Sequence, residues 1–180
     1  MSSAEAILSI DLGTSGPKVA LVSSAGAILA WEFEPVRLTL LADGGAEQSP
    51  ADWWEAIGRA SRRLAASSGV TQVAAVGATA QWSGTVAVGA DDRPLGNAII
   101  WMDSRGAPDV KALMAGRPTI AGYGAAKLLT WLRLTGGAPG LAGKDPIAHI
   151  LYLKRAHPEI SRDASVFLEP KDYLNLRLTG

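Results

Sequence analysis

The sequence predicts an α/β fold in which helices cover the faces of a mixed β-sheet. Two observations lead to this prediction. Three short β-type segments follow one another near the N-terminus with only tight turns between them, which indicates an antiparallel meander. A capped amphipathic helix and another apolar strand come next, and this order suits a mixed sheet with helices on its faces.

The predicted strands are short apolar runs that end at turn-forming residues. The meander strands are expected at residues 6–12, 18–23 and 27–37. Later strands are expected at residues 73–79, 85–88, 98–101 and 165–168. Residues 42–48 have the composition of a polar loop. Pro17 cannot donate a ladder hydrogen bond, so the second strand should start after it or bulge there.

The first helix has a well-marked start. Ser49 is a good N-cap, Pro50 suits the first helical position, and Asp52 lies three residues after the cap. Gly69 ends the helix. Trp54, Ile57, Ser61 and Leu64 share one face of this helix. Further helices are expected at residues 125–135, 145–157 and 170–178.

The composition excludes several classes of site. The 180 residues include 17 basic and 17 acidic side chains, no cysteine and two histidines. Zero net charge gives no indication of nucleic-acid binding, and disulfides or thiolate metal sites are impossible. No apolar run approaches the ~18 residues of a membrane span, and the first residues do not resemble a signal peptide. We therefore expect one compact domain of a soluble, cytoplasmic protein with neither nucleic-acid nor membrane partners.

An acidic residue lies at the end of the first strand, directly before a turn rich in glycine and hydroxyl groups. Gly13 allows the backbone to approach a phosphate, Thr14 and Ser15 add hydroxyl donors, and Lys18 adds a positive charge. Asp11 could hold Mg²⁺, which prefers carboxylate, water and phosphate oxygens. The alternative is an ordinary hairpin, in which aspartate and glycine are common.

A second group of polar and aromatic residues follows the strand predicted at 73–79. The amide of Gln81 can donate and accept hydrogen bonds toward vicinal hydroxyls. The indole of Trp82 can stack on the C–H face of a sugar, and Ser83 adds a hydroxyl. A loop with a buried tryptophan is the alternative interpretation.

A third group follows the strand predicted at 98–101. If this stretch is extended, Trp101, Asp103 and Arg105 point to the same side. Asp103 could accept hydrogen bonds from sugar hydroxyls while Arg105 keeps it ionised. The alternative is an ion pair at a strand end, which has little energetic effect.

Together these groups resemble the start of a carbohydrate kinase of the FGGY family, and the xylulokinases in particular. The resemblance extends from Ile7 to Gly180 and rests on the fixed order of its motifs. They are Asp11-x-Gly13-Thr14-Ser15-Gly16, Glu47-Gln48-x-Pro50-x-x-Trp53-Trp54, Gln81-x-x-Gly84, Arg93-Pro94-Leu95, Trp101-x-Asp103-x-Arg105 and Pro170-Lys171-Asp172-Tyr173-Leu174-x-x-Arg177-Leu178-Thr179-Gly180.

The resemblance implies the ribonuclease H-like fold shared by actin and the sugar kinases, with two domains around a cleft. It also implies phosphoryl transfer from Mg-ATP to a hydroxyl of a sugar or polyol. The family's phosphate and magnesium motif falls on Asp11, Thr14 and Lys18. The family meets its substrate at the positions of Gln81, Trp82, Ser83 and Asp103.

By the same resemblance, residues 1–180 are part of the N-terminal domain of the kinase. The C-terminal ATP-binding domain is absent, and the catalytic aspartate is expected in a Gly-Asp motif beyond Gly180. We therefore expect no kinase activity from this chain alone. Apolar surface left near Leu176 and Leu178 should favour self-association, for example as a homodimer.

The chain also departs from the family pattern. Trp82 and Ser83 replace the Met-His usual in xylulokinases and the Arg-Glu usual in glycerol kinases, so the sugar cannot be carried over. Residues 116–144 are unusual for the family, and there Tyr123 and Lys127 could shape a different pocket.

Two other classes remain open. A non-catalytic ATP-binding module of the actin or Hsp70 type would share the Asp11 hairpin but not the sugar motifs. A nuclease of the same fold would need clustered acids for two metal ions, and the balanced charge disfavours it.

Overall fold

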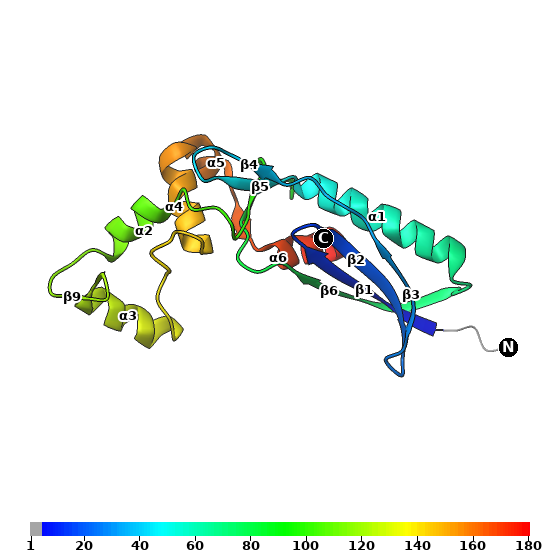
Figure 1. The fold of residues 1–180 in the computed structure, drawn as a ribbon. Helices are drawn as coiled ribbons and strands as arrows, with labels where there is room; N and C mark the ends of the chain where they lie inside the picture. Colours follow the sequence, from blue (N-terminus) through cyan, green and yellow to red (C-terminus); the bar gives the residue numbers. More distant parts are fainter. Residues whose placement is uncertain (1–4) are drawn as a thin grey trace. The chain divides into compact units, whose positions relative to one another are not determined.

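The computed structural model describes residues 5–180, and this part of the chain divides into two compact units (Figure 1). The first unit contains the chain up to Thr39 together with Gln48–Trp82 and Leu168–Gly180. The second unit contains Leu40–Glu47 and Ser83–Phe167. The first unit is thus assembled from three separate stretches of the sequence and the second from two.

A four-stranded mixed sheet forms the centre of the first unit. Its strands are β1 (Glu5–Gly13), β2 (Gly16–Ser23), β3 (Ile28–Phe33) and β6 (Gln72–Ala80), in the order β3-β2-β1-β6. The meander strands pair antiparallel, whereas β6 lies parallel to β1. A parallel neighbour requires a crossover connection, and α1 (Pro50–Ser67) lies in that connection. The mixed sheet of the α/β prediction is confirmed.

Helix α1 begins as the sequence predicts. The Ser49 hydroxyl accepts a hydrogen bond from the Asp52 backbone N–H at 3.2 Å, and Pro50 occupies the first turn. The buried face of α1 includes Ile57 and Leu64 and contains Trp53, whereas Trp54 lies at its edge. Its fully buried members are Pro50, Trp53, Ala56, Ile57, Ala60 and Leu64. They lie at i, i+3, i+4 and i+7 spacing, which gives one apolar stripe along the helix.

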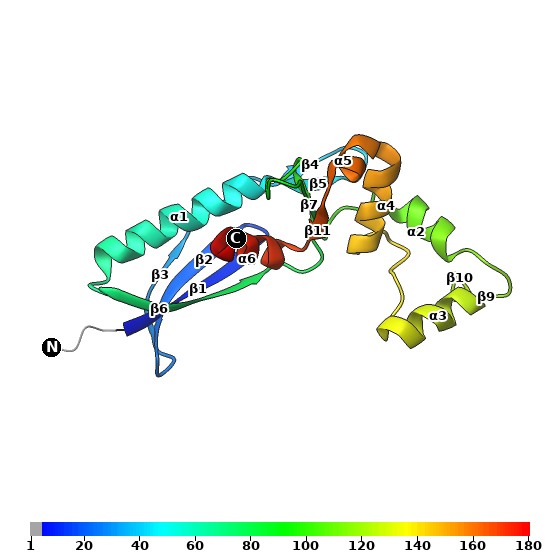
Figure 2. The same cartoon turned by 180° about the vertical axis from the view of Figure 1, so that it is seen from behind.

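That stripe packs on one face of the sheet. Residues of β1 and β2 alternate between buried and exposed, and the buried ones include Ile10, Leu12, Val19 and Leu21. Helix α6 (Pro170–Thr179) contacts β6 (Figure 2). The Arg177 guanidinium of α6 lies 4.9 Å from the centre of the Trp54 ring, and this contact ties α6 to α1.

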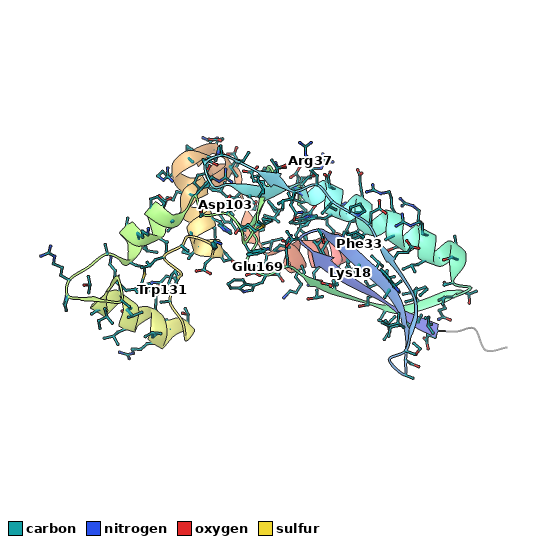
Figure 3. The ribbon with its side chains drawn as sticks, viewed as in Figure 1. Lys18, Phe33, Arg37, Asp103, Trp131 and Glu169 are labelled. Carbon is teal, nitrogen blue, oxygen red and sulfur yellow. The ribbon has the colours of Figure 1, made fainter. Side chains whose placement is uncertain are left out.

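The opposite face of the meander exposes apolar side chains. Trp31 and Phe33 of β3 pair across the sheet with Ala20 and Lys18, and both aromatic rings are exposed. Figure 3 shows Lys18 and Phe33 on this face. Strand β3 ends at Phe33, four residues earlier than its predicted end at Arg37.

The expected interruption at Pro17 is wrong. Strand β2 includes Pro17, which pairs with Leu12 without a bulge. The Pro17 carbonyl accepts a hydrogen bond from the Glu34 N–H at 3.1 Å, just past the end of β3. The N–H that proline lacks would therefore have pointed at the chain just beyond β3. At the end of a strand the loss of one ladder hydrogen bond is tolerated.

The second unit combines helices with short strands. Its helices are α2 (Ala107–Met114), α3 (Ala125–Thr135), α4 (Pro146–Ala156) and α5 (Pro158–Asp163). Its strands are β7 (Val86–Val88), β8 (Ala98–Ile99), β9 (Thr119–Ile120), β10 (Tyr123–Gly124) and β11 (Val166–Leu168). Strand β7 pairs with β11, and β9 pairs with β10. No helix within residues 5–180 is long and apolar enough to cross a membrane.

Two short strands lie where the chain passes between the units. Strands β4 (Thr39–Leu40) and β5 (Ala46–Gln48) form a small sheet with β8, in the order β4-β5-β8. The prediction of a polar loop over 42–48 is therefore wrong for its last residues. The reason is a non-local pairing: the Ile100 N–H donates to the Ala46 carbonyl at 3.1 Å.

Two clusters of buried residues stabilise the second unit. One joins Ala87, Ile99 and Leu153, and the other joins Val110, Met114 and Ala148. Helix α3, in contrast, has no fully buried residue although it carries four leucines and a tryptophan. Gly136 ends α3 in the left-handed conformation, with φ of 76°, at the predicted end of the helix.

Candidate functional site

The hairpin between β1 and β2 carries the residues predicted to hold phosphate. Asp11 and Lys18 are cross-strand partners, and Lys18 Nζ lies 3.8 Å from Asp11 Oδ2. Their side chains are 51% and 58% exposed, respectively, so a ligand can reach both. An exposed ion pair has little effect on stability, so this carboxylate and ammonium can change partners when a ligand binds.

One glycine of the hairpin is required by close packing. Gly16 has φ of 141°, and a Cβ atom there would overlap the carbonyl oxygen of Glu34. Gly13 is different, because a Cβ atom there would lie 3.6 Å from the Gly16 oxygen, an ordinary contact. Of the two glycines that flank Thr14 and Ser15, only Gly16 therefore lies where a side chain would not fit.

Gln81 lies directly beside this turn. Strand β6 runs parallel to β1, and the Gln81 N–H continues the ladder by donating to the Leu12 carbonyl at 2.7 Å. The Thr14 hydroxyl donates to Gln81 Oε1 at 3.0 Å. The structure thus joins one residue of the predicted phosphate hairpin to one residue of the predicted sugar contact. Trp82 follows with its side chain 70% exposed.

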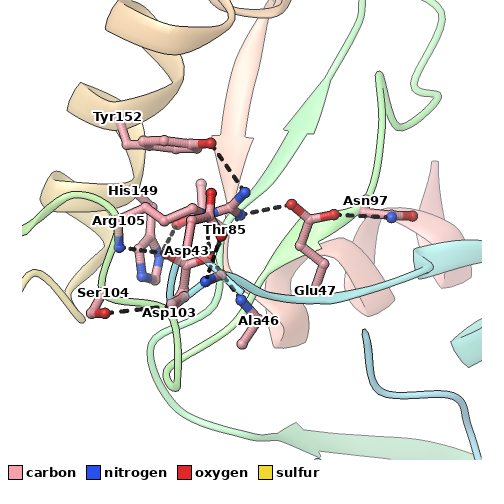
Figure 4. A network of polar contacts seen from close by, with 12 residues as sticks. Asp43, Ala46, Glu47, Thr85, Asn97, Asp103, Ser104, Arg105, His149 and Tyr152 are labelled. Atoms are coloured by element: carbon pink, nitrogen blue, oxygen red, sulfur yellow. Dashed lines mark hydrogen bonds and ion pairs between the residues drawn. The ribbon is translucent and has the colours of Figure 1, made fainter. Parts of the chain in front are cut away.

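Asp103 and Arg105 form a buried network in the second unit (Figure 4). Asp103 Oδ1 accepts from the Arg105 N–H at 2.9 Å. Asp103 Oδ2 accepts from Arg105 Nε and from the Ala46 N–H, both at 2.9 Å. Arg105 also donates to Glu47 Oε1 at 2.7 Å and to the Tyr152 hydroxyl at 3.0 Å.

Burial and charge pairing shift the pKa of Arg105 in opposite directions. Burial lowers the pKa of Arg105, but hydrogen bonds to Asp103 and Glu47 outweigh it, so the pKa lies above its usual value. The guanidinium also lies 4.5 Å from the centre of the Tyr152 ring. Glu47 in turn accepts from the Asn97 amide at 3.1 Å. Arg105 is therefore a permanent cation that connects β5, the loop after β8, and α4.

Further buried polar groups lie in the same unit. Ser83 is fully buried, and its hydroxyl donates to the Lys144 carbonyl at 2.6 Å. His149 is also buried, and its Nδ1 pairs with the Thr85 hydroxyl at 3.1 Å. Burial lowers the pKa of His149 to about 4, although Asp103 and Asp145 favour its charged form. His149 is therefore neutral at pH 7.

A family model decides the identity of the chain. The model of the N-terminal domain of the FGGY family of carbohydrate kinases matches residues 6–180. The chain belongs to the FGGY family of carbohydrate kinases. The alternatives of an actin- or Hsp70-type module and of a nuclease are not favoured by this membership.

Curated relatives within the FGGY family are sugar and polyol kinases. The chain is 34% identical to the xylulose kinase of Escherichia coli (strain K12) over 96% of its own length and 33% of that protein. It is 36% identical to the erythritol kinase of Brucella abortus (strain 2308) over 97% of its own length and 32% of that protein. The chain spans about a third of the length of these relatives.

Solved FGGY kinase structures have the same fold. A Brucella ovis protein described as a xyloylose kinase superposes with a TM-score of 0.80 and 26% identity, covering 94% of this chain and 33% of that one. The glycerol kinase of Plasmodium falciparum, solved with ADP, also gives a TM-score of 0.80, at 22% identity and over 98% of this chain and 34% of that one. The predicted ribonuclease H-like, actin-like fold is confirmed by these neighbours.

The predicted site residues of this FGGY chain lie in both units. Asp11, Gly13, Thr14, Ser15, Lys18, Gln81 and Trp82 belong to the first unit. Ser83, Asp103 and Arg105 belong to the second. Within the units, the structure joins Thr14 to Gln81 and Asp103 to Arg105.

Sequence reasoning missed the residues that hold these groups in place. They are Gln48, Glu47, Tyr152 and His149. Glu47 and Gln48 were noticed only as part of a motif before the helix, although adjacent residues of a strand point to opposite sides. Because the sequence predicts a loop over residues 42–48, this alternation becomes visible only in the structure.

The unusual segment of the chain forms a pocket of its own. A pocket of about 310 Å³ is lined by Leu113, Ala126, Lys127, Thr130 and Trp131; Figure 3 labels Trp131. Lys127 Nζ donates to the Leu113 carbonyl at 2.6 Å. Tyr123 does not line this pocket, and its hydroxyl donates to the Pro139 carbonyl at 3.0 Å.

Proposed function

We propose that this chain is the N-terminal part of an enzyme that transfers the γ-phosphoryl group of ATP to a hydroxyl of a sugar or polyol. It would supply the phosphate hairpin and the sugar contacts of that enzyme. Membership of the FGGY family and relatives that are xylulose and erythritol kinases support this function. We place the enzyme in the cytoplasm, because ATP is available there and a chain without cysteine needs no oxidising compartment.

The observation that carries the proposal is the direct hydrogen bond from Thr14 to Gln81. Phosphoryl transfer requires the donor phosphate and the acceptor hydroxyl to be held next to each other, because catalysis is mostly positioning and charge stabilisation. A hairpin suited to phosphate and an amide suited to sugar hydroxyls share one hydrogen bond here. Their separation in sequence is 67 residues, so the fold brings them together.

The hairpin fits the phosphates of Mg-ATP. Lys18 supplies an exposed positive charge, and Thr14 and Ser15 supply hydroxyl groups at a turn. Residues 5–180 contain no cluster of three or more Asp, Glu, His or Cys side chains suited to a metal ion. Mg²⁺ needs no such cluster, because it keeps waters and takes one or two carboxylates with substrate phosphates. The exposed carboxylate of Asp11 fits that role, in which the ion would neutralise phosphate charge.

The sugar side of the site is built from both accessible and buried residues. Gln81 and the exposed indole of Trp82 are open to a ligand in the first unit. In the second unit, the buried pair of Asp103 and Arg105 would support the sugar-binding loops from inside. Ser83 would act through its hydrogen bond to the Lys144 carbonyl. The acceptor we propose is a ketose or polyol, not necessarily xylulose.

The catalytic base and the adenine site are proposed to lie in the part of the enzyme that corresponds to the other two thirds of the relatives. An ADP-release assay on the complete enzyme tests the function, with pentuloses, hexuloses and polyols as acceptors. Sugar-dependent ADP formation that disappears in Asp11→Asn is the expected result. ADP formation that no acceptor accelerates would reject the proposal.

A further inference from the structure

Three residues close a ring of hydrogen bonds in the first unit, two of them through side chains alone and Thr14 through both its hydroxyl and its backbone carbonyl. The Thr14 hydroxyl donates to Gln81 Oε1 at 3.0 Å, and Gln81 Nε2 donates to Gln48 Oε1 at 2.7 Å. Gln48 Nε2 then donates to the Thr14 carbonyl at 2.8 Å. The ring joins the β1–β2 turn, the end of β5 and the residue after β6, three segments far apart in sequence.

Gln48 is the member of the ring that no ligand can reach. It is 2% exposed, and its Nε2 also lies 3.4 Å from the Arg37 carbonyl. With Nε2 directed at two carbonyl oxygens, the amide of Gln48 has one orientation, and its Oε1 must face Gln81. Gln81 is then oriented as well, because a flipped Gln81 amide would place its oxygen against the oxygen of Gln48.

The ring also limits what Thr14 can do. A hydroxyl has one proton, so while Thr14 donates to Gln81 it cannot donate to a phosphate oxygen. When a phosphate takes that proton, the lone pair of Gln81 Oε1 that faces the turn is released, and a sugar hydroxyl at the turn can donate to it. Each ligand therefore removes a competitor of the other.

We propose that Gln48 is a positioning residue that couples the Thr14 hairpin to Gln81, so that nucleotide binding strengthens sugar binding and the reverse. This inference rests on the proposed function, since it takes Thr14 and Gln81 as the phosphate and sugar contacts. Coupling between two ligands is reciprocal by thermodynamic linkage. One exchanged neutral hydrogen bond corresponds to a factor of about five in a dissociation constant.

The test is calorimetry on the complete enzyme with the best acceptor of the sugar panel. The dissociation constant for the sugar is measured with and without Mg²⁺ and a non-hydrolysable ATP analogue. In the wild type the analogue should tighten sugar binding. In Gln48→Met, which keeps the length of the side chain without its polar atoms, we expect this tightening factor to fall about fivefold.

A second variant opens the ring from its accessible side, in case Gln48→Met does not fold. Thr14→Val removes the competing donor, so sugar binding without nucleotide should become about as tight as in the nucleotide-bound wild type. Thr14→Ser keeps the hydroxyl and should retain the coupling. If the ring had only a structural role, these substitutions would weaken the binding of nucleotide and of sugar equally. The tightening factor would then stay unchanged.

Arg177→Met is the matched control for general weakening of the first unit. It removes the cation above the Trp54 ring without touching the hydrogen-bonded ring, so the tightening factor should persist. An unchanged factor in both Gln48→Met and Thr14→Val would overturn the inference while sugar phosphorylation stands. A wild-type enzyme that phosphorylates no acceptor would instead overturn the proposed function, and this inference with it.

Discussion

His149 lies in the interior of the second unit, where a positive charge is unfavourable. Its side chain is 1% exposed, and burial lowers its pKa from 6.5 to about 4 against the opposing effect of Asp103 and Asp145. Between these two pH values the unfolded chain binds a proton that the folded chain does not bind. The folded state therefore loses stability as the pH falls through this window.

We predict that acidification from pH 7 to pH 4 lowers the free energy of unfolding through His149 by on the order of 3 kcal/mol. His149→Gln should remove this contribution, and urea unfolding at a series of pH values measures it. His157 is half-exposed, and His157→Gln is the matched substitution of the chain's other histidine. The same pH dependence in His149→Gln and the wild type would contradict the prediction.

The second residue-scale prediction concerns Asp103. Asp103→Ala removes one of the two carboxylates that neutralise buried Arg105, and a buried charge that loses its partner costs roughly 3–5 kcal/mol. Because Glu47 remains, we expect a loss near the lower end of that range. In the complete enzyme, turnover of the sugar should fall far more than nucleotide affinity, because the network belongs to the proposed sugar side.

Urea unfolding and steady-state kinetics measure the two effects of Asp103→Ala. Asp91→Ala is the control, since it breaks an exposed ion pair with Arg93 in the same unit and should change little. An unaltered dependence of the rate on sugar concentration in Asp103→Ala would reject a role for Asp103 on the sugar side.

At the scale of elements, the β1–β2 hairpin depends on how closely β2 approaches the chain beyond β3. We predict that Gly16→Ala lowers the free energy of unfolding by ~2 kcal/mol or more, because the methyl group meets the Glu34 carbonyl and the positive φ is strained. Gly13→Ala is the matched substitution three residues earlier, where the space is adequate. Chemical denaturation of both variants measures the two losses in the free energy of unfolding. Equal losses would mean that position 16 tolerates a side chain as well as position 13 does.

Strand β5 shows how one element can serve two networks. Its consecutive residues Glu47 and Gln48 bond to Arg105 of the second unit and to Gln81 of the first. Strand β5 pairs with β4 and β8, each of which consists of two residues. Strand β8 also lies far from β5 in sequence. Local sequence patterns carry little information on such a strand, which explains why it was predicted to be a loop.

At the scale of the whole molecule, this chain covers about a third of its FGGY relatives. We predict that residues 1–180 alone form no ADP in a sugar-dependent way. A general base contributes typically ~10²–10⁴-fold, and positioning of two reactants can supply roughly 7–11 kcal/mol; neither is expected from this part of the enzyme. Sugar-dependent turnover at ~1–10³ per second, the range of ordinary enzymes, would mean that a complete site is present.

The isolated chain is also expected to self-associate. Trp31, Phe33 and Leu178 are exposed in the first unit, and Leu129 and Leu134 of α3 are exposed in the second. Light scattering across a concentration series should show dimers or larger species, and Trp31→Ser with Phe33→Ser should reduce them. A monomer at all concentrations would contradict this prediction.

The sequence by itself determined the order of the main elements and the family of the chain. The meander, α1, β6, α3, α4 and α6 follow from local rules: apolar periodicity, the Ser49 cap, and the Gly136 stop. The family followed from short motifs in a fixed order. Helices α2 and α5 and strands β4, β5, β9 and β10 escaped prediction because they are short, and β5 in addition depends on pairing with the distant strand β8.

Only the tertiary structure decided which side chains of the candidate site meet. The ring of Thr14, Gln81 and Gln48 joins residues separated by 33 to 67 positions, and Arg105 finds Glu47 across 58. No local pattern specifies such pairs, because they form when strands and helices pack. The burial of Asp103, Arg105 and His149 was likewise hidden, since polar residues are usually exposed, and only the surrounding partners make their burial favourable.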